Sequence, residues 1–267
     1  MSDPTLVTVT TQNGVAVVTR CNPPVNALTL QMTRELNAIL SSLAADDSVR
    51  SIVMTGAGEK SFGAGSDISE FHSLIEGNDV IERKMAYENE TFSLLSALDK
   101  PTIAALNGSA FGGGLEIALA CDLIVADAGQ VVGLPEITLG LFPGSGAPVR
   151  LVRRVGSARA AELILTGEPI PVETAMSWGM INRVVEAGQS LDYAVGWAQR
   201  LAASSVSGLR ACKQALRDAV QFEQGEVAIR ESLELTRAAF AHPDAREGAS
   251  AFIEKRGARF PSVVAGS

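Results

Sequence analysis

Two glutamates stand alone in stretches of the chain that otherwise carry no charge. Glu116 is the only charged residue in the segment 101–121, and Glu136 is the only one in the segment 131–149. An ionised carboxylate in apolar surroundings costs about several kcal/mol unless it is paired or hydrogen-bonded. Carboxyl groups with perturbed pKa values gather at active sites, so both residues are candidates for acid–base catalysis.

Each glutamate also has a structural explanation, and the spacing alone leaves both explanations open. Glu116 falls in the first turns of a predicted helix, where the N-terminal partial charge favours a carboxylate by about 0.3 to 1 kcal/mol. Glu136 follows Pro135 and could be a solvated loop residue.

Two glycine-containing loops could supply backbone donors beside these carboxyl groups. Gly112 to Gly114 follow a predicted strand and open a helix, while the loop SFGAGSDI (61–68) places Asp67 at a predicted helix start. Glycine lets the backbone approach a ligand, and N–H groups at a helix start point outward. One N–H group from each loop could converge on a single carbonyl oxygen. Two ordinary tight turns would have the same composition.

Other catalytic and nucleotide-binding motifs fail on spacing. The stretch GAGEKS has Glu59 where a P-loop requires glycine, and no glycine cluster completes GxGxxG. No serine lies in GxSxG, and the only two histidines, His72 and His242, are far apart in the sequence and do not form the pattern of a catalytic triad or a zinc site. We therefore expect no metal site, and a surface or capping role for both histidines.

Composition predicts a protein of the cytoplasm. The chain has 267 residues, is 46% hydrophobic and 19% charged, and carries a net charge of −8. This charge disfavours binding to nucleic acid or to an anionic membrane surface. The sequence contains neither a signal peptide pattern nor 18 consecutive apolar residues. Three widely spaced cysteines suggest a reducing compartment without a disulfide framework.

The pattern of elements indicates an α/β fold. The β-branched runs LVTVT and GVAVVTR predict a hairpin, Met32 to Leu43 predict an amphipathic helix, and RSIVMTG, TIAAL and DLIVAD predict buried strands. A charged helix is expected over 79–99, and helices with one strand, INRVV, follow residue 150. We divide the chain into an α/β core, 1–190, and a helical C-terminal region, 191–267.

Six stretches, taken together and in register, resemble the enoyl-CoA hydratase/isomerase family, also called the crotonase family. They are NPPVNAL (22–28), SFGAGSDISEF (61–71), NGSAFGGGLEIALACD (107–122), LPEITLGLFPGSG (134–146), AMSWGMINRVV (175–185) and DAREGASAFIEKR (244–256). The resemblance covers nearly the whole chain. It implies a crotonase-like spiral of ββα units with a C-terminal helical region that takes part in trimerisation, as a homotrimer or a dimer of trimers.

The resemblance also implies roles for the residues singled out above. The backbone N–H groups of Ser66 and Gly113 fall on the family's oxyanion hole, where the hydroxyl of Ser66 has no assigned role. Glu116 and Glu136 fall on the two glutamates that hold water in family hydratases.

The family binds acyl-CoA as its substrate and needs no further cofactor. Its contacts with substrate and CoA fall on Ala27, Ala64, Asp67, Ile68 and Lys255, the last one often reached from a neighbouring subunit. Lys60 is a further candidate cation for the CoA phosphates. A solvated surface charge remains an equal alternative for Lys255.

The sequence departs from the family pattern after the second glutamate, where GSGAPVRL replaces GAGGTQRL and brings in Ala147 and Pro148. The presence of both glutamates favours an enoyl-CoA hydratase, a hydro-lyase of fatty acid metabolism. Isomerisation, hydrolysis or decarboxylation of another acyl-CoA is an alternative, as is a non-catalytic subunit that binds CoA thioesters.

Overall fold

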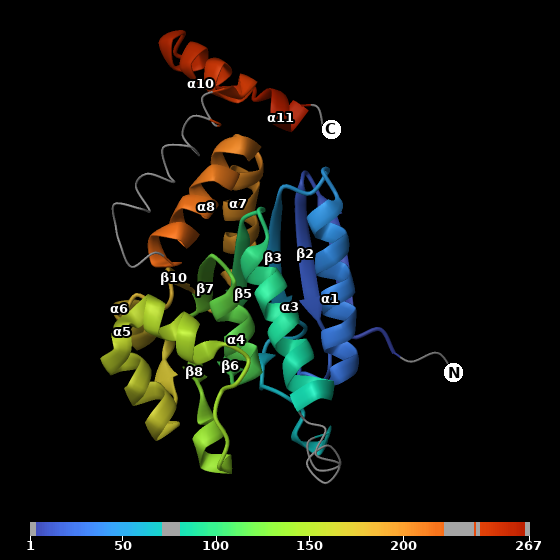
Figure 1. Ribbon diagram of the computed structural model, residues 1–267, viewed down its shortest axis with the longest axis vertical. Coiled ribbons are helices and arrows are strands. Elements are labelled where there is room, and N and C mark those ends of the chain that lie inside the picture. The colour runs from blue at the N-terminus through green and yellow to red at the C-terminus, as the bar shows by residue number, and fades with distance from the viewer. Residues whose placement is uncertain (1–3, 71–80, 222–237, 239–240, 265–267) are drawn as a thin grey trace.

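A six-stranded sheet runs through the centre of the computed structural model, which describes residues 4–70, 81–221, 238 and 241–264 (Figure 1). Its strand order is β1-β2-β3-β5-β7-β10. The strands are β1 (Val7–Gln12), β2 (Val15–Arg20), β3 (Ser51–Gly56), β5 (Thr102–Leu106), β7 (Leu123–Asp127) and β10 (Arg183–Val185). β1 and β2 pair antiparallel and the other neighbours pair parallel. The predicted hairpin and strands are confirmed.

A second sheet of four short strands carries the glycine loops. Its order is β4-β6-β8-β9, with β4 (Ser61–Gly63), β6 (Ser109–Phe111), β8 (Val131–Gly133) and β9 (Ile170–Pro171). The sequence predicts a loop at β4, because a strand of three residues that ends in glycine gives no periodic pattern. Its parallel pairing with β6, where Ser61 is opposite Ser109, brings the loop that contains Ser66 next to the glycines before residue 115.

Both faces of the large sheet are buried at its inner strands β3, β5 and β7, which explains their nearly continuous apolar sequences. Ile52 and Met54 of β3 belong to the core shared with α1 (Leu30–Ala45), α3 (Ala86–Ala97) and α4 (Gly113–Ala120). Val53, on the opposite face, packs with α7 (Ser190–Ala202). Figure 1 shows α1 and α3 side by side in front of the sheet.

The predicted amphipathic helix is α1, and the side chain of Thr29 caps it by accepting the N–H of Met32 at 3.1 Å. The helix expected over 79–99 is described from residue 81. It starts with a π-helical turn, Ile81–Met85, before α3. Residues 79 and 80 lie outside the described part.

The second half of the chain is mainly helical, as predicted. The elements are η2 (Pro135–Leu139), α5 (Ala147–Thr166), α6 (Val172–Ser177), α8 (Val206–Gln221), α10 (Pro243–Ile253) and α11 (Pro261–Val264). α5 begins earlier than its apolar pattern indicates, because Pro148 fits the first turn of a helix and Gly156, at φ 78°, joins two helical pieces. A predicted helix over 226–240 lies outside the described residues except for residue 238.

The last two helices stand at one end of the molecule. Figure 1 shows α10 and α11 beyond α8, at the opposite end from β6 and β8. α7, by contrast, begins at Ser190 and covers one face of the central sheet. A division of the chain at residue 190 stays a prediction.

Candidate active site

A cleft of about 370 Å³ opens where the loop after β4, α3, the start of α4 and η2 meet. Most of the surface of this cleft is apolar. The residues that line it are Ala64, Gly65, Ser66, Ile68, Met85, Ala86, Glu88, Asn89, Gly112, Gly113, Glu116, Pro135, Glu136, Leu139, Leu141, Phe142, Gly144 and Ser145. The cleft therefore brings together residues from four segments that are far apart in the sequence, 64–68, 85–89, 112–116 and 135–145.

Two backbone N–H groups, those of Ser66 and Gly113, lie next to each other in this cleft. A β-carbon placed on Gly113 would lie 3.6 Å from the amide nitrogen of Ser66. The loop is fixed on both sides of Ser66, because Leu28 donates its N–H to Gly65 at 2.8 Å and accepts the N–H of Asp67 at 2.9 Å. Among the described residues, neither the Ser66 nor the Gly113 N–H has a protein acceptor.

Glu116 lies in the first turn of α4, and only 3% of the residue is exposed. Its Oε1 accepts the N–H of Ala147 at 2.9 Å. Burial raises the pKa of Glu116 to about 7; the bond from Ala147 opposes this shift, while the nearby charges of Glu136 and Glu88 add to it. A carboxyl group with this pKa exchanges protons readily at neutral pH.

Glu136 extends from η2 toward the start of α4. A β-carbon placed on Gly112, whose φ is +50°, would lie 2.9 Å from Glu136 Oε1. Its Oε2 is buried and accepts no hydrogen bond within the described residues, and burial raises the pKa of this carboxyl as well. The residue is half-buried. The alternative of a freely solvated loop residue is therefore wrong.

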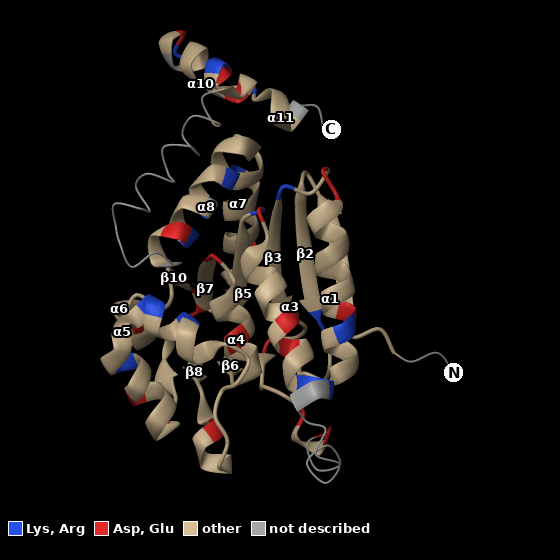
Figure 2. Cartoon of the chain, in the orientation of Figure 1, with Lys and Arg blue, Asp and Glu red and all other residues tan. Residues whose placement is uncertain are grey.

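A third carboxyl group, Glu88 of α3, lines the same cleft and was missed in the sequence. Its side chain is 1% exposed, and burial raises its pKa while Lys84 and two serine hydroxyls oppose the shift. Glu88 shares a helix face with Phe92 and Leu95, at spacings of four and three, and this periodicity is the signal that could have revealed its burial. Figure 2 shows acidic residues on both α3 and α4.

The remaining predicted contact residues divide into two groups. Ala64 and Ile68 line the cleft. Ala27 does not line it but precedes Leu28, which donates its N–H to Gly65 of the cleft, and the carbonyl of Ala27 accepts a hydrogen bond from Asn22 at 2.8 Å. Asp67 and Lys255 do not line the cleft. Asp67 instead accepts the N–H of Ser69 at 2.9 Å, and the pKa of Asp67 is lowered by its bond to the hydroxyl of that serine.

Lys255 comes two residues after α10, which Figure 1 shows at the opposite end of the molecule from β6 and β8. A role for it at the cleft of a neighbouring subunit stays a prediction. Lys60 borders a separate hollow, which is lined by Pro23, Pro24, Asn26, Ala57, Gly58, Glu59 and Lys60.

Within the described residues, no cluster of three histidine, cysteine, aspartate or glutamate side chains has the arrangement of a metal site. His242 accepts the N–H of Asp244 at 3.2 Å at the start of α10, which confirms its predicted capping role. His72 lies outside the described part. In the described ranges, no helix has both the length and the apolar character needed to cross a bilayer.

Two neighbouring amide donors lie in one cleft with the buried carboxyl group of Glu116 and the half-buried carboxyl group of Glu136. Groups of these kinds can polarise a carbonyl oxygen and transfer protons beside it. Such an arrangement on an α/β fold is typical of enzymes that act on carbonyl compounds.

Comparison with known proteins agrees with this description. Residues 10–262 match the family model described as enoyl-CoA hydratase/isomerase. A short-chain-enoyl-CoA hydratase of Clostridium acetobutylicum is 37% identical over 92% of this chain and 93% of its own length. A 2,3-dehydroadipyl-CoA hydratase of Escherichia coli is 38% identical over 86% of this chain and 87% of its own.

A solved structure, an enoyl-CoA hydratase from Bacillus anthracis, superposes with a TM-score of 0.89 at 31% identity and covers 97% of this chain and 100% of its own. The chain belongs to the enoyl-CoA hydratase/isomerase family, and it has the crotonase fold.

Proposed function

We propose that this protein is an enoyl-CoA hydratase, which adds water across the α,β double bond of a 2-enoyl-CoA thioester. One observation carries the proposal: Glu116 and Glu136 line the same cleft as the N–H groups of Ser66 and Gly113, which have no acceptor in the part of the chain that the structure describes. The hydratases that match nearly the whole chain support it.

In the proposed reaction, the N–H groups of Ser66 and Gly113 donate hydrogen bonds to the thioester carbonyl oxygen. One carboxylate takes a proton from water while the water oxygen bonds to C3. The electron pair of the C=C bond moves toward C2 and the thioester oxygen, where the two N–H groups stabilise the enolate. The other carboxyl group, protonated at the start, delivers its proton to C2, so that the pair as a whole neither gains nor loses a proton.

The pair must hold one proton for this reaction. Burial raises the pKa of Glu116 to about 7 and also raises the pKa of Glu136, and the charge of Glu136 adds to the shift of Glu116. Two neighbouring carboxyl groups that disfavour each other's charge titrate as a unit. Near neutral pH the pair is thus suited to act as one acid and one base.

The acyl group is left open by the relatives, because two of them at nearly equal identity are named for different acyl groups. The cleft offers apolar contact through Leu139, Leu141 and Phe142. Lys60, and Lys255 from a neighbouring subunit of a trimer or hexamer, are the proposed cations for the CoA phosphates. CoA enters as part of the substrate, with no additional cofactor.

The proposal is tested with a panel of 2-enoyl-CoA thioesters of increasing chain length, including members whose acyl chain carries a second carboxyl group. Hydration removes the absorbance of the conjugated thioester and adds the mass of one water molecule to the product. A product of unchanged mass would identify an isomerase, free CoA a hydrolase, and release of carbon dioxide a decarboxylase. Thermal stabilisation by acyl-CoA without any product would identify a binding subunit, and each of these four outcomes would overturn hydration.

A further inference from the structure

Glu88 joins the two sides of the candidate active site. Its carboxylate accepts the hydroxyl of Ser66 at 3.0 Å and 3.2 Å, one distance to each oxygen, and the hydroxyl of Ser145 at 3.0 Å. Ser66 belongs to the loop after β4, while Ser145 belongs to the segment between η2 and α5. One buried side chain of α3 therefore binds both loops.

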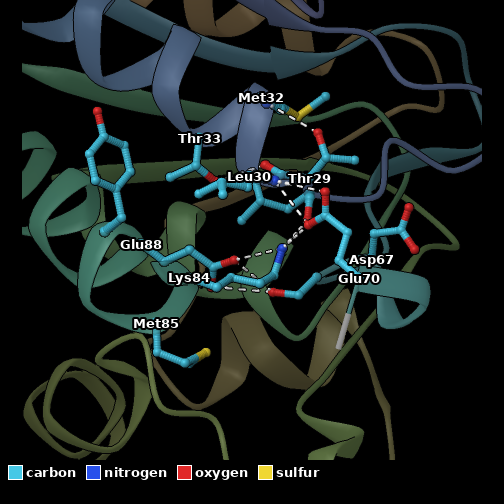
Figure 3. A network of polar contacts seen from close by, with 12 residues as sticks. Thr29, Leu30, Met32, Thr33, Asp67, Glu70, Lys84, Met85 and Glu88 are labelled. Atoms are coloured by element: carbon cyan, nitrogen blue, oxygen red, sulfur yellow. Dashed lines mark hydrogen bonds and ion pairs between the residues drawn. The ribbon is translucent and has the colours of Figure 1, made fainter. Parts of the chain in front are cut away.

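A buried lysine holds Glu88 from the other side. Lys84, in the π-helical turn before α3, is fully buried and lies 3.5 Å from Glu88 and 2.6 Å from Glu70 (Figure 3). It also donates to the carbonyl of Leu28 at 3.0 Å. The same carbonyl accepts the N–H of Asp67, the residue after Ser66. Lys84 therefore contacts the backbone that holds the Ser66 loop, and Glu88 contacts the Ser66 side chain.

On the second loop, Ser145 lies two residues before Ala147, which is the hydrogen-bond partner of Glu116. Ala147 donates its N–H to Glu116 at 2.9 Å. The carbonyl of Ser145 accepts a hydrogen bond from Arg150 at 2.8 Å. The hydroxyl of Ser145 is thus the link from this loop to Glu88, and through Glu88 to Ser66.

We propose that Glu88 is a positioning residue, which fixes the Ser66 N–H donor and the Glu116 carboxyl group relative to each other. This inference rests on the proposed hydration. Both oxygens of Glu88 already accept hydrogen bonds from hydroxyl groups, and an ammonium group lies beside one of them. The carboxylate is therefore engaged by the protein, and it acts through Ser66 and Ser145. It also gives the Ser66 hydroxyl a partner that the sequence did not reveal.

Replacing Glu88 by glutamine keeps the shape but cannot accept hydrogen bonds from both serine hydroxyls through two equal oxygens. We expect Glu88→Gln to lower kcat by about 10- to 100-fold, because small displacements of reacting groups have effects of this size. KM should change by less than about 3-fold, since the substrate contacts themselves remain. The matched control is Glu90→Gln, an exposed residue of the same helix, which should leave kcat unchanged.

Ser145→Ala provides a second variant. It removes a single hydroxyl and keeps the charged partner of Lys84, the Glu88 carboxylate. If Glu88 acts through Ser145, the double variant should lose less than the product of the two single losses. Fully multiplicative losses would contradict this coupling. Thermal unfolding of each variant separates loss of positioning from loss of the folded protein.

A spectroscopic measurement tests the oxyanion side independently of turnover. Butyryl-CoA with a ¹³C-labelled carbonyl has no double bond to hydrate, and two hydrogen bonds from the protein should lower its C=O stretching frequency on binding. Glu88→Gln should lose part of this shift, and Glu90→Gln should keep all of it.

Unchanged kcat and an unchanged carbonyl shift in Glu88→Gln would overturn the positioning role, and so would a change confined to KM. A wild-type protein whose carbonyl shift depends on Glu88 but which hydrates no enoyl-CoA would overturn the proposed function and leave the positioning role intact. Absence of any carbonyl shift in the wild-type protein would overturn both.

Discussion

Glu116 and Glu136 reach the same cleft from different elements, a helix of the core and a short helical turn before α5. Their environments differ. Glu116 has a backbone donor, Ala147, whereas Oε2 of Glu136 has no partner within the described residues. A buried oxygen without a protein donor is suited to bind water or substrate, because a buried polar atom otherwise loses hydrogen-bond energy.

The first prediction concerns turnover at these two residues. Glu116→Gln and Glu136→Gln should each lower kcat for 2-enoyl-CoA hydration by about 10²- to 10⁴-fold, the usual contribution of a positioned acid or base. Steady-state kinetics measure the loss, and circular dichroism checks that the fold is retained. Glu162→Gln, an exposed change on α5, is the control. Full activity in either site variant would remove that residue from the mechanism.

The second prediction concerns stability and pH. In the folded state the pKa of Glu116 is raised from 4.5 to about 7, so between these values the folded state retains a proton that the unfolded state releases. Wild-type stability therefore falls as the pH rises from about 4.5 to 7. Glu116→Gln, which has no proton to lose, should be more stable than wild type at pH 8 by up to about 3 kcal/mol.

Urea unfolding of both proteins at pH 8 and at pH 4 measures this difference. Near pH 4 it should largely disappear, because the carboxyl group is then mostly protonated in both states. A glutamine variant that is less stable at pH 8 would show that Glu116 is held as a carboxylate, contrary to its raised pKa.

At the scale of elements, the site depends on how closely α4 approaches the loops around it. A β-carbon on Gly114 would lie 2.2 Å from the carbonyl oxygen of Gly63, and one on Gly112 would lie 2.9 Å from Oε1 of Glu136. The glycines before and at the start of α4 therefore let β4 and η2 come into contact with it. Side chains at these positions would separate the donors from the carboxyl groups.

The third prediction tests this approach with Gly112→Ala. Both backbone strain, from φ +50°, and contact with Glu136 oppose an added methyl group. Gly129→Ala is the matched control, because Gly129 has φ +78° but no atom within 4 Å of the new β-carbon. Both variants should lose about 1 to 3 kcal/mol of stability from backbone strain.

Only Gly112→Ala should also lose hydration activity, by at least about 10-fold, because it alone displaces the Glu136 carboxyl group. Kinetics and thermal unfolding on the two variants separate these effects. Equal activity in both variants would show that hydration does not depend on the position of the Glu136 carboxyl group.

At the scale of the whole molecule, α8 is joined to the central core by a buried lysine. Lys213 donates to the carbonyl of Lys100 at 2.9 Å and pairs with Asp122, which in turn accepts the N–H of Thr102 at 2.7 Å. This network connects the helical C-terminal region to the ends of β5 and α4. Arg210, on the same helix, pairs with Asp99 in a much more exposed position.

The fourth prediction compares these two pairs. Lys213→Met should cost about 1 to 3 kcal/mol in the free energy of unfolding, because the carboxylate of Asp122 and the carbonyl of Lys100 lose a charged donor that is itself buried. Arg210→Met should cost less than about 1 kcal/mol, as exposed ion pairs do. Urea unfolding at low and at high salt measures both. Equal losses would show that the buried network does not hold α8 to the core.

By itself, the sequence determined the strands and helices with periodic patterns, because regular burial repeats along the chain. It also showed the isolation of Glu116 and Glu136 and the motifs that indicate the family, because these depend on residues close together in sequence. The shared cleft required tertiary structure, since its residues come from four distant segments. The same holds for Glu88. One acidic residue of a charged helix is buried and its neighbour Glu90 is exposed, and this depends on what packs against α3. Tertiary structure also decided which residue binds the Ser66 hydroxyl and where the short strand β4 forms. It likewise placed Lys255 away from the cleft of its own chain. Contacts between distant segments leave no local pattern in the sequence.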